Sequence, residues 1–239
     1  MAVVASSELT SQVTTLYTGT DRFYALLVNN PGANLDASAT YLQVIEQELD
    51  PDIGGYLRQE FVYASSDINA YSAGVSVDSK RVTFTHNGTP TTVWSISHVA
   101  VVRAPSSRTT INVKPRLGTF DLSATGTDPA TDRVTISASD WANIVDGDRV
   151  VIDPYQGVTL PAGLAINTYY YVKKVGTNQL ELYSDVALST IIDITGVSAG
   201  FGFLQNATGT LLGIHELPST VNVSATQSVL YDISINQGQ

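Results

Sequence analysis

The sequence predicts an all-β fold, with an antiparallel β-sandwich or barrel-like base domain and a small β-meander domain inserted into it. Short runs of β-branched and aromatic residues recur along the 239 residues, separated by clusters of Gly, Pro, Asn and Asp. Helical patterns are few. A buried strand is predicted at residues 94–102. The segment that continues its pattern, residues 210–217, comes only after a self-contained module, so the sequence predicts that this module is inserted.

The elements follow from local composition, taken in chain order. Residues 6–17 fit either a polar helix or an extended arm, and residues 38–48 fit either a short helix or a strand. Residues 139–143 predict one helical turn, capped by Ser139 or Asp140. The predicted strands span residues 23–28, 56–63, 81–85, 96–102, 109–113, 133–137, 149–152, 169–175, 180–183, 211–215, 220–223 and 229–235.

Turn residues place the domain boundaries. The segment 104–108 contains Pro105 and leaves the first domain, whereas the Gly- and Ala-rich segment 196–209 leads back into it. We therefore expect a discontinuous base of residues 1–104 plus 206–239 and an insert of residues 105–205. Within the insert, Asp146-Gly147-Asp148 predicts a tight turn, because glycine adopts a positive φ without a steric penalty. Trp94 and Tyr56 are the expected anchors of the base core, and Trp141 that of the insert.

Composition and charge exclude several classes of function. Only 14% of residues are charged, well below the roughly 25% of ordinary soluble domains, so much of the surface is neutral and polar. Such a surface costs little to desolvate and suits a subunit buried in an assembly. The net charge of −10, with no basic cluster, disfavours a nucleic-acid partner. The absence of cysteine removes disulfides and thiolate metal sites.

The lengths of the apolar runs test for a signal peptide and for a membrane-spanning segment. The first eight residues lack a basic region, and their apolar run is too short for a signal peptide. The longest apolar runs are the size of a strand, far short of the ~20 residues that cross a bilayer. We expect a soluble chain made without an export signal, with no membrane insertion.

The motifs of common enzymes and metal sites are missing. His86, His98 and His215 are the only histidines, and no two have the spacing of a helical zinc site. His98 and His215 are expected to make hydrogen bonds in the core or across strands. Ser97-His98 has no nucleophile elbow around it. We expect no catalytic residue, no metal site and no cofactor.

Acidic pairs are the remaining catalytic alternative. Glu46 with Glu48, or Asp50 with Asp52, would have to supply the two carboxylates of a glycosidase, which adjacent residues of one exposed loop seldom do. Asp146 and Asp148 lack the further oxygen ligands of a calcium loop. The glycosylation triplets that begin at Asn87, Asn206 and Asn222 are interpreted as chance matches in a chain rich in Ser and Thr.

Tyrosines offer a surface for recognition. The chain has 12, and residues 169–171 are three in a row, of which Tyr169 and Tyr171 share one face of a strand and Tyr170 the other. At least one of these faces is expected to be core. Tyr155, Tyr170 and Tyr183 are the candidate contacts with a partner, for example by stacking on a glycan.

Two sets of short motifs carry resemblances to known families. The insert contains the segments 145–151 (VDGDRVV), 160–164 (LPAGL), 168–172 (TYYYV), 178–180 (NQL) and 192–196 (IDITG). In this order they resemble a small β-module of tail-fibre and other virion proteins of tailed bacteriophages. The base contains the segments 23–27 (FYALL) with Pro31, 55–58 (GYLR), 94–98 (WSISH) and 211–218 (LLGIHELP) with Val221. These resemble a compact all-β virion protein of phages.

The resemblances imply a function without catalysis. In the second family the WSISH-like and LLGIHELP-like segments follow each other closely, whereas this chain carries the insert between them. The implied role is a structural subunit of the virion, in a tail appendage, fibre or baseplate, made in the host bacterial cytoplasm. The alternatives are a capsid decoration (cement) protein and a carbohydrate- or receptor-binding module. Expected partners are other virion proteins, further copies of the chain and a host-surface glycan.

Overall fold

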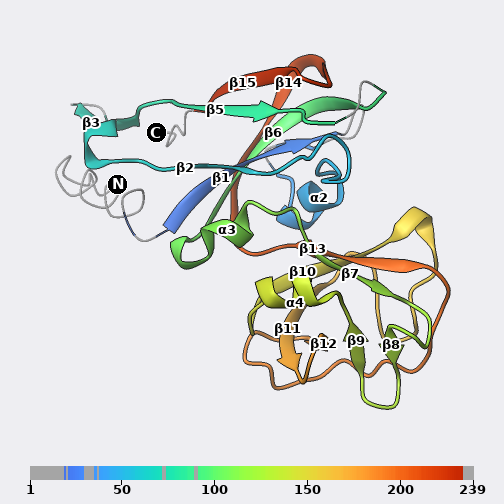
Figure 1. Cartoon of the computed structure of the whole chain (residues 1–239). Helices are drawn as coiled ribbons and strands as arrows, with labels where there is room; N and C mark the ends of the chain where they lie inside the picture. The colour runs from blue at the N-terminus through green and yellow to red at the C-terminus, as the bar shows by residue number, and fades with distance from the viewer. Residues whose placement is uncertain are drawn as a thin grey trace.

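The computed structural model describes residues 19, 21–29, 35, 36, 38–71, 74–88 and 91–233, and its strands form two groups (Figure 1). The upper group in this view is the base and the lower group is the insert. The strands of the base are β1 (Asp21–Val28), β2 (Gln59–Phe61), β3 (Ile68–Tyr71), β4 (Gly74–Val77), β5 (Lys80–Thr85), β6 (Val93–Pro105), β14 (Thr210–Ser224) and β15 (Ser228–Ile233).

The main core of the base lies between two antiparallel layers. A four-stranded sheet in the order β14-β6-β1-β2 faces the β15-β5 pair, and β3 pairs with β4 separately. Trp94 is 2% exposed and Tyr56 is fully buried, which confirms both as anchors of this core. Their rings meet edge to face, with centroids 5.9 Å apart. The base is therefore a two-layered β-structure, as the sequence predicts.

The other face of the four-stranded sheet carries a second cluster. Because side chains alternate along a strand, the residues of β1 from Tyr24 to Val28 that do not face the main core pack against helix α2 (Tyr41–Glu46). The helical alternative for residues 38–48 is thus confirmed. Thr40 caps the helix, since its hydroxyl accepts from the Gln43 amide while the Gln43 side chain accepts from the Thr40 amide. Val151 and Ala207 complete this cluster beside the insert.

The insert is one seven-stranded antiparallel sheet in the order β7-β13-β10-β11-β12-β9-β8. Consecutive β10, β11 and β12 are neighbours, as a meander predicts, whereas β13 returns between β7 and β10. Phe120, Tyr170 and Leu204 are among the buried residues of its core. Its strands are β7 (Arg116–Asp121), β8 (Thr127–Asp128), β9 (Arg133–Thr135), β10 (Arg149–Pro154), β11 (Tyr169–Val175), β12 (Gln179–Tyr183) and β13 (Phe201–Asn206).

Trp141 is not the anchor of the insert core. It lies on helix α4 (Ala138–Asn143) and packs at the edge of the core, only partly buried. Its indole donates to the Gln179 carbonyl at 3.3 Å, and the Lys174 ammonium lies 3.6 Å from the centre of its ring. The prediction of a central tryptophan was wrong because the amphipathic indole keeps one side at the surface.

The predicted strand at residues 109–113 is a helix instead. After β6 the chain forms a 3-10 turn (Ser106–Arg108) and then helix α3 (Thr109–Asn112). The segment crosses from one sheet to the other, so β-branched residues that favour a strand find no neighbour to pair with. The buried Asn112 side chain donates to the Pro105 carbonyl at 2.9 Å and ties the turn to the end of β6.

Three strands of the insert escape the sequence pattern. One is β8, which has only two residues. Glycine interrupts the other two, which are β7, with Gly118, and β13, with Gly202, inside the segment expected to be a linker. A β-carbon at Gly202 would lie 2.8 Å from the Phe120 ring, so glycine is what allows that ring to pack across the strand.

Other boundaries shift by a few residues. The predicted strand 56–63 is regular only at β2, and those at 211–215 and 220–223 are parts of the single strand β14. The pairing of β14 with β6 shifts between Glu216 and Val221, where Pro218 is tolerated because β14 is an edge strand. The turn at Asp146-Gly147 is confirmed, with φ +86° at Gly147. Ser137, not Ser139 or Asp140, caps α4, because its extended backbone lets its hydroxyl accept from the Asp140 amide.

Helices in the part of the chain that the structure describes are too short or too polar to cross a membrane. Residues 6–17, for which a helix or an arm was expected, and residues 234 and 235, predicted to end the last strand, lie outside the described residues.

We expect Trp94→Ala to destabilise the base by about 3–5 kcal/mol, because it removes a large ring from a closed core. Hydrogen exchange would show this as lost protection of the β5, β6 and β15 amides, while amides of β10 to β12 keep theirs. An equal loss in both groups would contradict the division at residues 105 and 205. Val186→Ala, at a side chain 69% exposed, is the neutral control.

Candidate functional site

The three tyrosines expected at a contact surface differ in exposure. Tyr155 is 43% exposed, whereas Tyr170 is 2% and Tyr183 6% exposed. The Tyr170 hydroxyl is bound inside the insert by the Ala165 backbone, at 2.8 Å from its amide nitrogen. The Tyr183 hydroxyl donates to the Glu181 carboxylate at 2.7 Å. Burial therefore corrects the expectation for Tyr170 and Tyr183, and of the three only Tyr155 presents its ring to solvent.

The histidines have structural partners. His98 is 2% exposed, and its Nδ1 lies 2.8 Å from the Ser97 hydroxyl. His98 pairs with Glu216 and His215 with Val99 across β6 and β14, so the two histidines are neighbours on adjacent strands. His86 is fully buried against Trp94, and its Nδ1 accepts from the Gly88 amide at 3.1 Å. Among the described residues no group of three or more His, Cys, Asp or Glu could hold a metal ion.

Three of the four carboxylates considered for glycosidase chemistry lie in ion pairs with arginine. The fourth, Glu46, ends helix α2, where partial burial and then the Asp153 charge raise the pKa of its carboxyl. Glu48 binds Arg58 with both oxygens, at 2.8 and 2.7 Å. Asp50 and Asp52 both bind Arg116, which belongs to β7 of the insert. These pairs lie where the base meets the insert, and they identify the boundary between the two as the most organised polar region of the molecule.

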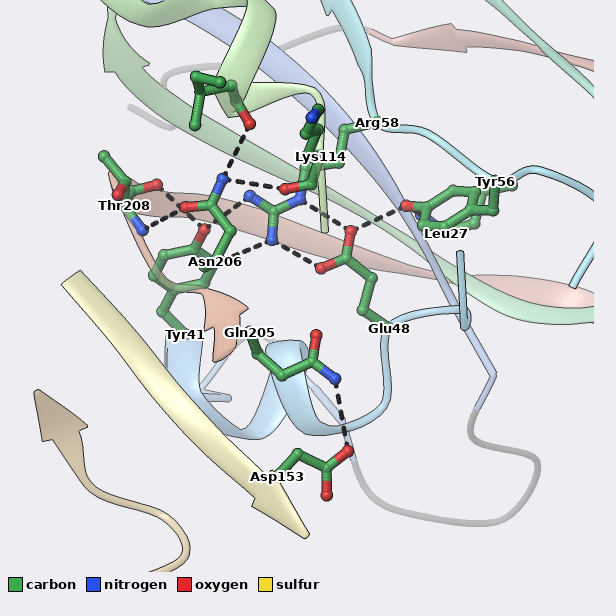
Figure 2. A network of polar contacts seen from close by, with 11 residues as sticks. Leu27, Tyr41, Glu48, Tyr56, Arg58, Lys114, Asp153, Gln205, Asn206 and Thr208 are labelled. Carbon is green, nitrogen blue, oxygen red and sulfur yellow. Dashed lines mark hydrogen bonds and ion pairs between the residues drawn. The ribbon is translucent and has the colours of Figure 1, made fainter. Parts of the chain in front are cut away.

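The centre of this boundary is a buried ion pair (Figure 2). The side chains of Arg58 and Glu48 are 1% and 3% exposed. The fork of the guanidinium faces both carboxylate oxygens, the geometry that makes an arginine pair strong. Burial is the largest single effect and lowers the pKa of the guanidinium. The charge and hydrogen bonds of Glu48, together with the Tyr41 and Tyr56 hydroxyls, outweigh burial and hold the pKa of Arg58 above its ordinary value.

Asn206 connects the ion pair to both chain crossings. Its carbonyl accepts from Arg58 Nη2 at 2.7 Å. Its side-chain amide donates to the carbonyls of Ile111 and Lys114, at 3.1 and 2.9 Å, and its side-chain oxygen accepts from the Thr208 amide. One fully buried asparagine thereby holds the chain that enters the insert against the chain that leaves it. Buried in this way, it has no accessible amide for glycosylation.

Two tyrosines close the network on the base side. The Tyr56 hydroxyl donates to Glu48 at 3.0 Å and accepts from the Leu27 amide at 2.9 Å. The Tyr41 hydroxyl donates to the Thr208 carbonyl at 3.2 Å. Burial raises the pKa of both hydroxyls, and the Glu48 charge raises it further, so each stays protonated as a donor.

Two arginines of the insert extend these contacts outward. Arg149 donates to the carbonyls of Ala207 and Gly209, at 2.9 and 2.6 Å, and its guanidinium lies over the Tyr169 ring at 4.5 Å. Arg116 binds the two aspartates of the base and lies 3.6 Å from the centre of the Phe203 ring. Arginine suits both positions because its planar head donates several hydrogen bonds while stacking on an aromatic ring.

These contacts hold the insert to the base, and they pair each charged group among them with a group of opposite charge or with hydrogen-bond partners. We name the residues at the centre of these contacts the junction network: Tyr41, Glu48, Tyr56, Arg58, Asn206 and Thr208. Sequence reasoning missed its two central residues, Arg58 and Asn206. The available signal was position: Arg58 lies two residues after the expected core anchor Tyr56 and so on the same face of the predicted strand, and a buried charge needs a partner. No protein-family model, curated protein or solved structure matches the chain.

We expect Glu48→Gln to lower the free energy of unfolding by about 3–5 kcal/mol, because it leaves the buried Arg58 charge uncompensated. The matched control is Arg81→Gln, which breaks an exposed pair with Asp232 (side chains 66% and 51% exposed) and should cost less than about 1 kcal/mol. Denaturant titration measures both variants. Glu48→Leu combined with Arg58→Met removes both charges and should recover much of the loss. Equal effects of Glu48→Gln and Arg81→Gln would contradict the network's importance.

A dependence on pH follows from Tyr56. Because its pKa is raised in the folded state, its contribution is complete below the unfolded value of about 10 and is lost as pH rises towards the folded value. Tyr56→Phe should therefore reduce the fall in unfolding free energy above pH 10 by about 1.4 kcal/mol per pH unit. Denaturant titrations between pH 9 and 11 measure this, and identical slopes in variant and parent would disprove it.

Proposed function

We propose that this protein is a non-enzymatic structural subunit of a tailed-phage particle, in a tail appendage, fibre or baseplate, where the base attaches and the insert is displayed. The observation that carries the proposal is the junction network, which holds the insert to the base through a buried ion pair and a buried asparagine. A rigidly mounted domain suits a displayed part of a particle. The resemblance of both halves to virion proteins supports the same role.

The surroundings of the carboxylates support a role without catalysis. Glu48 is neutralised by Arg58 at the centre of the network, and Asp50 and Asp52 share Arg116. A glycosidase needs one protonated and one ionised carboxyl group facing the same bond. Glu48, Asp50 and Asp52, committed to arginine pairs, serve attachment of the insert instead, which leaves Glu46 as the carboxylate that the activity test must address.

Composition supports assembly with other virion proteins and with further copies of the chain. A surface with few charges loses little hydration free energy when neighbouring subunits cover it. Homo-oligomers of this kind have closed symmetry, so one patch would be repeated around an axis. The charge of −10 makes nucleic acid an unsuitable partner.

Location in the particle is testable by labelling. Antibody against the insert, visualised by negative-stain microscopy of intact particles, should mark the tail. Labelling of the head would instead favour a capsid decoration protein, and particles without any label would refute the virion role. Particles that lack the protein should be unstable or fail to attach to cells.

The absence of catalysis has its own test. The purified protein, incubated with capsular or cell-wall polysaccharides, should release no reducing ends. Cleavage that disappears in Glu46→Gln or Asp50→Asn would identify a depolymerase and overturn the proposal.

A further inference from the structure

One face of the insert carries an unusual set of side chains. Alternation along β13 directs Gly202 and Leu204 into the core and Phe201, Phe203 and Gln205 to the opposite face. Register places Asp121 of β7 beside Phe201, and Asp153 of β10 beside Phe203. We name these residues, with Tyr155 directly after β10, the aromatic face: Asp121, Asp153, Tyr155, Phe201, Phe203 and Gln205.

The aromatic rings of this face are exposed at fixed positions. Phe201 is 49% and Tyr155 43% exposed, although burial of such rings normally stabilises a fold. Tyr155 meets Phe203 edge to face, with centroids 5.4 Å apart. The Arg116 guanidinium covers one side of Phe203 and is itself held by Asp50 and Asp52. The rings therefore form a platform supported from the base.

Tyr155 is presented by a strained turn. It begins the 3-10 turn Tyr155–Gly157, in which Gln156 adopts φ +52° and Gly157 φ +73°. A positive φ costs free energy for a residue with a β-carbon, and such positions concentrate at binding sites. The Gln156 side chain donates to the Tyr155 hydroxyl at 3.0 Å, which further orients the ring.

The polar groups of the aromatic face select the ligand's charge. Arg116 is the cation beside it, and the two aspartates of the base neutralise that charge. The Asp121 and Asp153 carboxylates then leave a negative balance that disfavours anions. Carboxylates accept hydrogen bonds from hydroxyl groups, and the Gln205 amide, 3.4 Å from Asp153, both donates and accepts. Exposed rings beside such groups match a pyranose, which has an apolar C–H side and a rim of hydroxyls.

We propose that the aromatic face binds uncharged oligosaccharides, with pyranose rings stacked on Phe201 and Tyr155 and hydroxyls bound by Asp153 and Gln205. This is a binding function separate from the assembly role of the base. Its residues belong to the insert, and the site can fail without affecting the location of the protein in a particle.

Saturation-transfer NMR on the full-length protein tests the proposal, with maltohexaose, cellohexaose, mannohexaose and chitohexaose as neutral probes and hexagalacturonic acid as the acidic probe. At least one neutral probe should receive saturation at its ring C–H protons, and the acidic probe should bind more weakly. Phe201→Ala and Tyr155→Ala should each raise the dissociation constant about fivefold to tenfold, because each removes one stacking contact.

Controls separate stacking from general exposure of apolar groups. Val186→Ala, at a side chain 69% exposed beyond β12, should leave binding unchanged, and Phe201→Trp should retain it. Asp121→Asn with Asp153→Asn should reduce the preference against the acidic probe. The proposal is overturned if no neutral probe gives more transfer than with the Phe201→Ala/Tyr155→Ala double variant, or if the acidic probe binds equally. A change of oligomeric state in Phe201→Ala, measured by light scattering, would make this face a subunit contact and overturn it too.

Discussion

The structure depends on one buried charge. Arg58 lies where the base meets the insert, too deep for water to solvate its guanidinium, and it is tolerated only because Glu48, Asn206 and two tyrosine hydroxyls surround it. These partners come from two distant parts of the chain, residues 41–56 and Asn206. Glu48, which supplies the two carboxylate oxygens, follows helix α2, and Asn206, which supplies the carbonyl, ends β13. Tyr56 also binds the Leu27 amide of the central strand β1. Satisfying this charge therefore requires helix, sheet and insert to be in place together.

The same requirement relates the fold to its function. A domain inserted through two flexible connections would move independently, since interfaces between domains of one chain are usually modest and polar. Here Asn206 binds backbone carbonyls on the entering chain, and Arg149 binds carbonyls on the leaving chain. Apolar packing of Val151 and Ala207 against α2 continues these contacts. The aromatic face consequently has a defined direction relative to the base.

Sequence reasoning predicted what depends on local patterns. Runs of β-branched and aromatic residues identified β1, β5, β10, β11 and β15, because each of these strands has at least one face in a core. Sequence reasoning failed where contacts between residues distant in the chain determine the secondary structure. Glycines interrupt strands β7 and β13, and the one in β13, Gly202, is needed for the Phe120 ring. Helix α3 carries strand-forming residues at a crossing without strand partners. Of the junction network, pattern reasoning noted Tyr56 as a core anchor, but Asn206 lay in a segment resembling a linker. Tyr155 was chosen as an exposed ring. Phe201 and Phe203 were not identified, because Gly202, which lies between them, interrupts the strand pattern.

The placement of the two crossings has a mechanical consequence. The chain leaves the base at the end of β6 and returns at the start of β14, and these antiparallel strands pair Arg103 with Thr210 at that point. A pull on the insert thus loads both strands at the same end and in the same direction, so they are not sheared against each other. The load passes instead to the long ladder between β6 and β1, where many hydrogen bonds resist sliding together. The insert is therefore attached at two adjacent points, on the edge strand β14 and on its neighbour β6, and β6 connects it to the rest of the sheet.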